Sequence, residues 1–526
     1  MDEEYSLSDP TQLLEAASEF AHDPGFLSDD STQEFLFRFP LPVIINALQT
    51  KADVPGLEDA LVACLERIFR TKYGASLIPL YMPFVVVGLG ADSQKVRCIA
   101  CKTVSCLLEY SYEANISAAR LVVEYEVYPL LLKCLIDGDE QVATASTDAI
   151  KKLAGSPDGL GIVFPADSNE ATHLRNVAAG CSSLGRIRVL ALVVKLFSIS
   201  GSVASVIYNS NLLSLLEAEL SNVTDTLVAL SVLELLYELA EIQHSTEFLS
   251  RTTLVQILTS LISNGSIGSI LRARAMTIIG RLLSKEDVFR FIDESSVKTV
   301  ISTIDGRLVL LENEDADEFE CTFEALGQIG MTIQGATFLL SNSPPTARHV
   351  VDAAFDQHGR GKQLAALHAL GNIAGETRSE SNRILNVNAE ESLRFLIYER
   401  ASKSSKLAPS GLFLSVLQQE SEIRLAGNRL ITGLVARPWC LMEICSRQEI
   451  INVVTDPFAE TTKIGMEARH NCCQAISKAL QSSPKLTSDP ALAATAAKLD
   501  EAVRRGPYLA RKHSEAQPAV MTADRF

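Results

Sequence analysis

Hydrophobic residues recur three and four positions apart along almost the whole chain, which is the period of an amphipathic helix. One such stripe is formed by Leu233, Leu235, Leu236 and Leu239. The period-two alternation that would indicate β-strands is almost absent. Short clusters of Gly, Asp, Ser, Asn and Pro separate helical runs of about 12–18 residues. The pattern predicts an all-α protein of antiparallel helical hairpins joined by tight loops.

The helical pattern repeats with one characteristic signature, an apolar residue followed by Arg, with a small residue four positions after the apolar one. The copies are Val96-Arg97, Ile187-Arg188, Leu271-Arg272 and Ile423-Arg424, with a degenerate copy at Ala468-Arg469. Copies without the Arg at Val142 and Val228 fill the gaps, so that successive copies lie 46, 45, 41 and 43 residues apart. We expect the small residue to allow close helix packing, and the Arg to reach loop carbonyls or an aspartate such as Asp92 or Asp139.

A period of about 40–47 residues with two or three helices per unit is typical of HEAT and armadillo repeats. The chain is therefore predicted to form an α-solenoid of about ten or eleven repeats with a right-handed superhelix and one concave face. We expect a continuous repeat body over 1–482, a capping helix over 483–503 and a flexible tail over 504–526. Two surface loops are expected, at Gly155–Ala171 and at Glu399–Gly411, the second accounting for an overlong repeat.

The composition restricts the function. With 64 acidic and 47 basic residues the formal net charge is −17, which argues against nucleic-acid binding and a polybasic membrane surface. The acidic N-terminus lacks the features of a targeting signal. The apolar segment Leu77–Ala91 contains two prolines and is shorter than the roughly 20 residues of a membrane span. We interpret it as a buried, kinked helical segment. The eleven scattered Cys are expected to be reduced, in a cytoplasmic or also nuclear protein.

No enzyme motif is evident, so we expect neither catalysis nor a cofactor. Gly359-Arg360-Gly361-Lys362 lacks the first Gly of a phosphate loop, where Asp356 stands, and no strand precedes it. Cys98, Cys101 and Cys106 share one predicted helix without the second ligand pair that a zinc site needs, and we interpret them as packing residues. His470 with Cys472 and Cys473 is interpreted in the same way, because Cys472 occupies the small position of its repeat.

Two features are candidate partner-binding sites. The first is a run of acidic residues, Glu312, Glu314, Asp315, Asp317, Glu318 and Glu320, which we expect to be a solvated loop that initiates a helix. The alternative is a docking site for a basic partner. The second is Trp439, the only Trp, which opens a repeat after the helix-breaking Pro438. A lone Trp in a helical array is more often a packing residue, but an exposed one would be an anchor for a partner.

The C-terminal third resembles a known family. The segments Asn428–Trp439, Ile450–Asp456 and Gly506-Pro507-Tyr508, with Glu467-Ala468-Arg469 and Lys478-Ala479-Leu480, are similar to the closing repeats of the family of 26S proteasome non-ATPase regulatory subunit 5. Leu326–Gly330 and Gly335–Leu340 resemble the middle of that family. The N-terminal third shares only the general repeat pattern.

The resemblance implies a chaperone and not an enzyme. Members of that family assist assembly of the base of the proteasome regulatory particle. They bind the C-terminal domain of an ATPase subunit during ring assembly and are absent from the mature particle. The resemblance assigns no binding residue here, and the free protein is expected to be a monomer. The alternative function is a general armadillo-like adaptor or transport scaffold for a basic peptide or a helical partner. The single Trp disfavours it, because cargo grooves of that class commonly present a ladder of Asn and Trp.

Overall fold

The structure is a computed structural model that describes residues 10–25, 27–50, 54–114, 118–165, 173–221, 223, 225–311, 316–482 and 490–508. All regular secondary structure in these residues is helical, which confirms the all-α prediction. The chain divides into two compact units, Met1–Thr252 and Thr253–Phe526. The repeats seen in each unit confirm the α-solenoid class.

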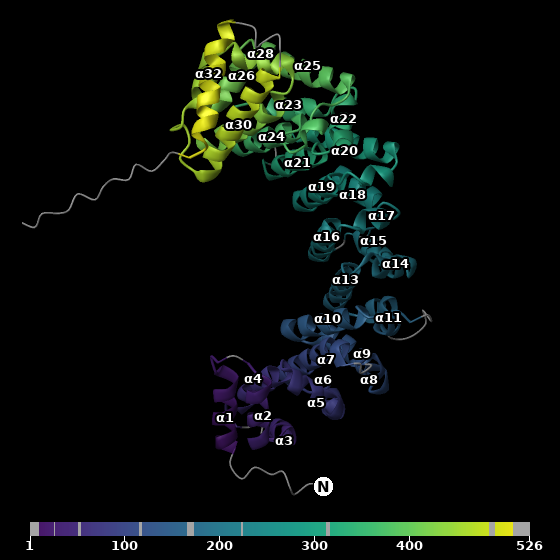
Figure 1. Ribbon diagram of the computed structural model, residues 1–526. Helices are drawn as coiled ribbons and strands as arrows, with labels where there is room; N and C mark the ends of the chain where they lie inside the picture. Colours follow the sequence, from purple (N-terminus) through teal and green to yellow (C-terminus); the bar gives the residue numbers. More distant parts are fainter. Residues whose placement is uncertain are drawn as a thin grey trace, which may run out of the picture. The chain divides into compact units, whose positions relative to one another are not determined.

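In the first unit a long helix begins each repeat and shorter helices follow it (Figure 1). The long helices are α4 (Leu57–Phe69), α7 (Gln94–Ala114), α10 (Glu140–Ala154), α13 (Ser183–Phe197) and α16 (Thr226–Glu241). The others are α1 (Pro10–His22), α2 (Asp29–Arg38), α3 (Leu41–Thr50), α5 (Lys72–Leu77), η1 (Ile78–Tyr81), α6 (Met82–Leu89), α8 (Ala118–Glu124), α9 (Val127–Asp137), α11 (Pro157–Val163), α12 (Leu174–Gly180), α14 (Gly201–Asn209), α15 (Ser214–Ser221) and α17 (Ser245–Leu249).

The second unit is also a series of helical repeats, but α20 (Glu294–Leu310) and α25 (Val387–Lys403), with 17 residues each, are longer than the first helices of their repeats. Its first helix of each repeat is α19 (Ser269–Leu283), α21 (Ala316–Ile329), α24 (Arg360–Ala374), α27 (Ser421–Leu434) or α30 (Lys463–Gln481). The others are α18 (Leu254–Ser263), η2 (Val288–Arg290), α20 (Glu294–Leu310), α22 (Ile333–Ser341), α23 (Ala347–Ala354), η3 (Glu380–Asn382), α25 (Val387–Lys403), α26 (Pro409–Leu417), α28 (Pro438–Cys445), α29 (Gln448–Thr455) and α32 (Pro490–Arg505). We refer to the ten repeat-initiating helices of the described residues as inner helices.

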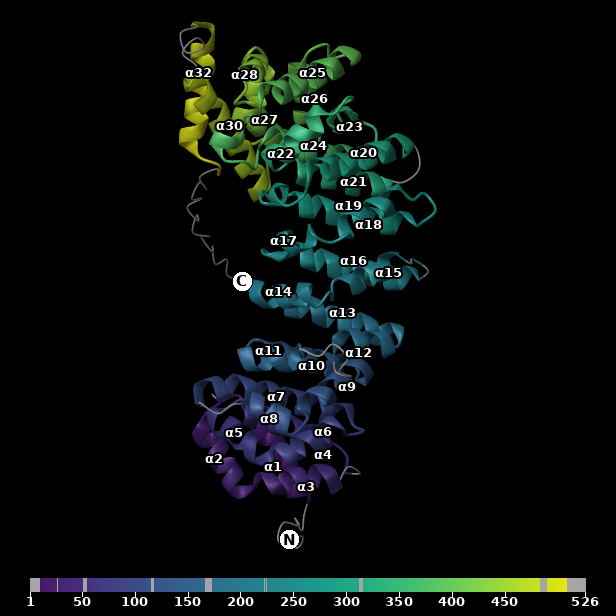
Figure 2. The ribbon, with the colours of Figure 1, turned by 90° about the vertical axis from the view of Figure 1, so that its right-hand side faces the viewer.

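Most complete repeats have three helical segments, the armadillo form, and not the two of a simple hairpin. Within each unit the inner helices pack on one another in chain order, α4 to α16 in the first and α19 to α30 in the second (Figure 2). Polar caps fix where they begin. The side chains of Asp139, Ser182 and Thr462 each accept a hydrogen bond from a backbone N–H in the first turn of α10, α13 and α30.

Small residues bring neighbouring inner helices of the second unit into backbone contact. A Cβ atom added to Gly280 in α19 would lie 2.7 Å from the Cα of Ala325 in α21. A Cβ added to Gly327 in α21 would lie 2.8 Å from the Cα of Ala369 in α24. Between the last helix of one repeat and the inner helix of the next, a Cβ on Gly427 would lie 2.6 Å from Val416 Cγ1 of α26. Gly427 is a small residue of the Arg signature and confirms the expected close packing there; Gly280 and Gly327 lie at other positions of the repeat.

The repeated Arg also meets its expected acceptors. Arg188 donates through Nη1 to the carbonyl oxygens of Leu135, Ile136 and Gly138 at 2.7–3.1 Å, at the end of α9. Arg424 donates to Gln419 O at 2.9 Å and Arg469 to Val454 O at 3.0 Å. These oxygens lie at helix ends or in the loops beside them, where carbonyls lack intrahelical partners. The expected partners Asp92 and Asp139 are wrong: the carboxylates bound by the repeated arginines of the second unit are glutamates, described below.

Three expectations about loops are wrong. The segment from Glu399 continues α25 to Lys403 and α26 begins at Pro409, so only a short connection separates two helices. The overlong repeat takes its extra length from the turn between α24 and α25, which holds η3, and from the 17-residue α25. Within Gly155–Ala171, residues Pro157–Val163 form α11, because Ser156 caps it and proline is favoured in the first turn. Residues 166–172 lie outside the described residues.

The apolar segment near Leu77 is kinked as expected but is not buried. Residues Lys72–Leu89 form α5, η1 and α6 in succession, and only 33% of them are buried. Leu80 and Val87 face outward while Met82 is buried. By length and composition this segment is the one candidate for a membrane span in the described residues. Length and composition alone do not make it one, because helices of soluble proteins meet the same criteria.

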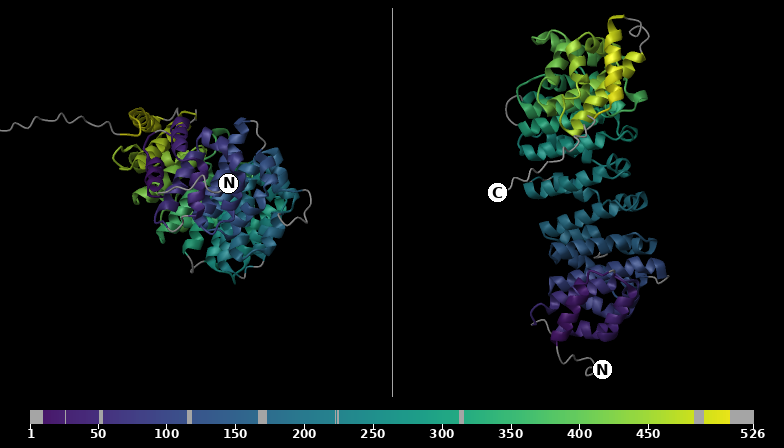
Figure 3. Two further views of the ribbon diagram at one scale, coloured as in Figure 1. Left: turned by 90° about the horizontal axis from the view of Figure 1, so that it is seen from below. Right: turned by 60° about the vertical axis from the view of Figure 1, so that its left-hand side comes forward.

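At the C-terminal end α32 packs against α30 (Figure 3). Gly506 has a left-handed conformation (φ +81°), and the chain turns there back towards the start of α30. Arg469, which is buried, donates to Pro507 O at 3.5 Å, and the Tyr508 hydroxyl hydrogen-bonds Glu467. Gly506-Pro507-Tyr508 thus holds α32 on the last repeat. Residues 483–489 and 509–526 lie outside the described residues, so the predicted tail is described only up to Tyr508.

Two glycine-to-alanine substitutions should change stability in opposite directions. Gly327→Ala should lower the free energy of unfolding by about 1–3 kcal/mol, because the added methyl meets the backbone of α24. Gly306→Ala, inside α20 with open space around it, should raise it by about 0.5–1 kcal/mol through helix propensity. Urea unfolding followed by circular dichroism measures both. Equal effects of the two variants would show that the inner helices are not in backbone contact.

Candidate protein-binding surface

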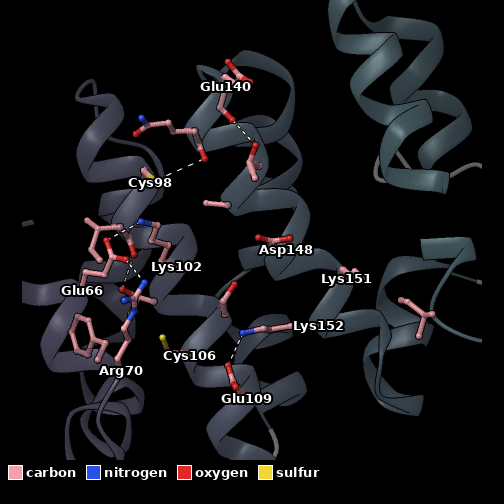
Figure 4. A pocket seen from close by; sticks show the side chains of 18 of the residues that line it. Glu66, Arg70, Cys98, Lys102, Cys106, Glu109, Glu140, Asp148, Lys151 and Lys152 are labelled. Carbon is pink, nitrogen blue, oxygen red and sulfur yellow. Dashed lines mark hydrogen bonds and ion pairs between the residues drawn. The ribbon is translucent and has the colours of Figure 1, made fainter. Parts of the chain in front are cut away.

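The candidate sites are grooves on the inner helices. In the first unit, a groove of about 1190 Å³ lies over α4, α7 and α10. Several of its charges pair with one another: Glu66 binds Arg70 at 2.6 Å and Lys102 at 2.8 Å, and Glu109 binds Lys152 at 2.6 Å (Figure 4). The lining also includes Glu140, Asp148 and Lys151, so that four acidic side chains face four basic ones and little net charge is left there to select a partner.

A groove of about 820 Å³ lies in the second unit between α27 and α30. Its floor contains small residues of α30 such as Ala468 and Ala475. Two of its carboxylates are also paired, Glu376 with Arg429 at 3.0 Å and Glu380 with Lys478 at 2.5 Å, and the third, Glu467, accepts a hydrogen bond from the Tyr508 hydroxyl. This groove therefore resembles the first in its balance of charge.

The groove between α21 and α24, of about 690 Å³, differs in its charge. We call it the α21–α24 groove; its lining includes Asp317, Glu320, Cys321, Glu324, Gln328, Leu364, Ala365, His368, Asn372 and Arg429. Asp317, Glu320 and Glu324 follow one another at helical spacing along α21 and so share one face. Among the residues that the structure describes, neither Glu320 nor Glu324 forms a salt bridge; Glu324 only accepts a 3.4 Å hydrogen bond from Gln328.

The opposite wall of this groove is uncharged. Leu364 and Ala365 are apolar, and the pKa of His368 is lowered by burial and by the nearby Arg429, so His368 is neutral at physiological pH. Glu320 lies close over Gly361, since a Cβ there would be 1.8 Å from its Oε1 atom. The α21–α24 groove therefore combines two carboxylates without an ion pair among the described residues, Glu320 and Glu324, with a single lining cation, Arg429, that is already paired with Glu376.

Glu318, expected to be solvated, is buried at 1% exposure. Arg272 donates to its carboxylate at 3.0 and 2.8 Å, and Arg307 at 2.7 and 3.3 Å, both with two nitrogens. Burial alone would raise the pKa of Glu318, but the hydrogen bonds and charges of the two arginines outweigh it and lower the pKa. Glu318 thus links α19, α20 and α21 and offers no surface to a partner.

The repeat spacing contains a signal for this ion pair. Glu318 follows Arg272 by 46 residues, one repeat length, so the two occupy equivalent places in successive inner helices. Arg424 and Glu460 form a related pair at 2.5 Å, but they are 36 residues apart and the buried Glu460 lies in the turn before α30. The spacing of one repeat length therefore identifies Glu318 but not Glu460.

The remaining predicted site residues are placed as follows. Glu312, Glu314 and Asp315 lie outside the described residues. Asp317 is exposed at the start of α21 and lines the α21–α24 groove. Trp439 is half-buried, with its ring centroid 5.7 Å from that of Tyr398 in α25, far in sequence from α21. The structure brings only Asp317 to the groove, joined there by Glu320 of the same acidic run and by Glu324.

Cysteine and metal chemistry finds no support in the described residues. All eleven Cys are free thiols, and burial raises the pKa of Cys473 to about 11, so this thiol is protonated at neutral pH. In the part of the chain with assigned positions, no group of three or more His, Cys, Asp or Glu side chains could hold a metal ion. Gly359–Lys362 forms the start of α24, and Arg360 there binds Glu420 and Glu422.

Comparison with known proteins gives one informative match. A sequence model of the family described as proteasome non-ATPase 26S subunit matches residues 62–524. No curated protein gives a significant match. Two crystal structures described as engineered proteins are similar at 14% identity. One covers 88% of this chain and 98% of its own at a TM-score of 0.41, and the other covers 55% and 97% at 0.35.

Glu318→Gln should lower the free energy of unfolding by about 3–5 kcal/mol, because it leaves two arginines beside a neutral amide in a buried place. Glu320→Gln, two residues away and without an ion pair, should change it by less than about 0.5 kcal/mol. Chemical denaturation of both variants tests this. A mild effect at Glu318 would mean that its carboxylate contributes little to holding α19, α20 and α21 together.

The lowered pKa of Glu318 also predicts a pH dependence. A carboxyl whose folded-state pKa is depressed stabilises the protein above its unfolded pKa, and this stabilisation is lost as the pH falls towards the folded pKa. The difference in unfolding free energy between wild type and Glu318→Gln should therefore be full at neutral pH and shrink below about pH 4.3. Denaturation at a series of pH values measures it; a constant difference would contradict the assignment.

Proposed function

The chain belongs to the family of proteasome non-ATPase 26S subunits, and we propose that it is an assembly chaperone for the base of the 26S proteasome regulatory particle. In this proposal it holds the C-terminal domain of an ATPase subunit during ring assembly and is released from the mature particle. The family match over residues 62–524 is the observation that carries the proteasome-related role. The resemblance of the closing repeats to the regulatory subunit 5 family supports the narrower chaperone role.

The architecture suits a protein that works by binding. Inner helices in register present their exposed side chains as parallel rows with grooves between them. Among the described residues no group of three or more His, Cys, Asp or Glu side chains could hold a metal ion. We propose a non-catalytic role, acting in the cytoplasm and also in the nucleus, in which partner surfaces compete for the same grooves.

Within this proposal, the α21–α24 groove is the contact that selects the partner. Glu320 and Glu324 form no ion pair among the described residues, and the lining of the α21–α24 groove holds three carboxylates against one cation, Arg429, which is itself paired with Glu376. The linings of the other two grooves hold acidic and basic side chains in equal number. Complementary charge across an interface raises the association rate and discriminates between partners. The ATPase domain held here should accordingly present a basic surface. Release would follow when contacts in the assembled ring compete for that surface.

Charge reversal tests the groove. The double variant Glu320→Lys/Glu324→Lys should bind its ATPase C-terminal domain at least about tenfold more weakly, since it replaces attraction by repulsion. The control is Glu391→Lys/Glu399→Lys on α25, outside the groove, which changes the net charge equally. Binding of each purified base ATPase C-terminal domain is measured by calorimetry at two salt concentrations. Equal affinity of the two variants would exclude the groove.

The chaperone role itself has a separate test. Quantitative mass spectrometry of purified particles should find the chain with base assembly intermediates and almost none in intact 26S proteasomes. Equal abundance in the mature particle would contradict the proposal even if the groove binds an ATPase domain.

A general adaptor for basic peptides is the second candidate, because Glu320 and Glu324 of the α21–α24 groove would also suit an extended basic segment. The two functions differ in what is recognised. An adaptor would bind unfolded basic peptides as tightly as a folded ATPase domain, whereas the chaperone should prefer the folded domain.

A further inference from the structure

The chain contains a single Asn-Gly pair, Asn264-Gly265. It lies in the exposed turn between α18 and α19, and a Cβ built on Gly265 would meet nothing within 4 Å. The backbone N–H of Ser266 donates to the side-chain oxygen Oδ1 of Asn264 at 2.9 Å. The turn thus presents an accessible side-chain amide beside an unhindered backbone nitrogen.

This arrangement is suited to an intramolecular reaction. The backbone nitrogen of Gly265 can attack Cγ of Asn264, forming an N–Cγ bond while the Cγ–Nδ2 bond breaks. Nδ2 leaves as ammonia and takes up the proton that the Gly265 nitrogen loses. Water then opens the five-membered imide at either carbonyl, giving aspartate or isoaspartate. One ammonia leaves, one water is added, and nothing is oxidised or reduced.

Three features of the turn lower the activation barrier for attack of the Gly265 nitrogen on Cγ of Asn264. Glycine has no side chain to obstruct the attacking nitrogen. Negative charge develops on Oδ1 as the nitrogen attacks, and the Ser266 N–H already points at that atom, as a donor in an oxyanion hole does. Asn264 has φ −78° and ψ 102° and must rotate about ψ to bring Cγ to the nitrogen; the open, exposed turn leaves room for this rotation.

We propose that Asn264 is the principal site of spontaneous deamidation and isoaspartate formation in this protein. Alanine is the next smallest residue that follows an asparagine in this chain, at Asn46 and Asn388, but both lie inside helices, α3 and α25. The Asn-Ser pairs at Asn209 and Asn342 come next. Asn209 is the last residue of helix α14, where the backbone is held in place. Asn342 follows α22, and no donor to its Oδ1 atom is seen in the described residues.

The modification would reach the α21–α24 groove. Arg272 of α19 donates through Nη1 to Ile267 O in the same turn and binds Glu318 of α21 with Nε and Nη2. Isoaspartate inserts one extra backbone carbon before Gly265, three residues before Gly268, the N-cap of α19. It therefore displaces the carbonyl that positions Arg272, and Arg272 in turn holds the first turn of α21, which carries the groove carboxylates. Isoaspartate formation would therefore weaken the hold of Arg272 on Glu318 and on the start of α21.

Peptide mapping by mass spectrometry after incubation of the folded, full-length protein in mildly alkaline buffer tests the proposal. Asn264 should deamidate at least about tenfold faster than Asn342 or Asn209, which corresponds to a barrier difference of about 1.4 kcal/mol. Gly265→Ala should slow the reaction by about the same factor. Ser266→Pro, which removes the N–H donor, should be slower than Ser266→Ala, which keeps it.

The aged protein should also unfold at a lower temperature than fresh protein, and aged Gly265→Ala should not. Several outcomes would overturn the proposal: a rate at Asn264 no greater than at Asn342, equal rates for Ser266→Pro and Ser266→Ala, or the same loss of stability in aged Gly265→Ala. None of these measurements involves a binding partner, so they do not depend on the proposed function.

Discussion

Contact between the backbones of neighbouring inner helices is the constraint on which the second unit depends. At Gly280 against Ala325, and at Gly327 against Ala369, there is no space for even one additional methyl group. Helices this close bury the apolar residues on both sides of the contact, which no single repeat could do. The same closeness fixes the rotation of each helix, because only the face with the small residues can approach its neighbour. The exposed side chains of successive helices are consequently brought into line, and the grooves follow from that alignment.

Buried and half-buried arginines supply hydrogen bonds to backbone carbonyl oxygens that apolar packing leaves without partners. Close stacking places helix ends and turns against the next repeat, where their carbonyl oxygens would lack partners. Arg188, Arg378 and Arg469 supply hydrogen bonds to such oxygens. Two of the buried guanidinium groups are also accompanied by a glutamate, Arg272 by Glu318 and Arg437 by Glu390 at 2.6 Å. Several of the 47 basic residues of this acidic chain therefore have buried side chains.

The fold was largely predictable because its signals are local and repeated. The helical period, the small positions and the signature Arg each recur about every 45 residues, so errors in one copy are corrected by the others. Single-copy features were not predictable in this way. Glu399–Gly411 is rich in Ser and Lys and resembles a loop, yet α25 continues to Lys403 because its apolar face, with Ile397 and Ala401 buried, packs on its neighbours. Tertiary packing there outweighs local composition.

The acidic run of residues 312–320 is a second feature whose structure could not be predicted from local composition. The run holds six carboxylates in nine residues, which look alike in the sequence. Those within α21 point to different sides of the helix, as Glu318 and Glu320 do. One side is occupied by Arg272 and Arg307, and the other faces the groove, whose single lining cation, Arg429, is paired with Glu376. A negative charge remains available for a partner only where the fold has not already supplied a positive one. Position relative to the buried arginines, and not the number of acidic residues, therefore determines which part of the run can recognise another protein.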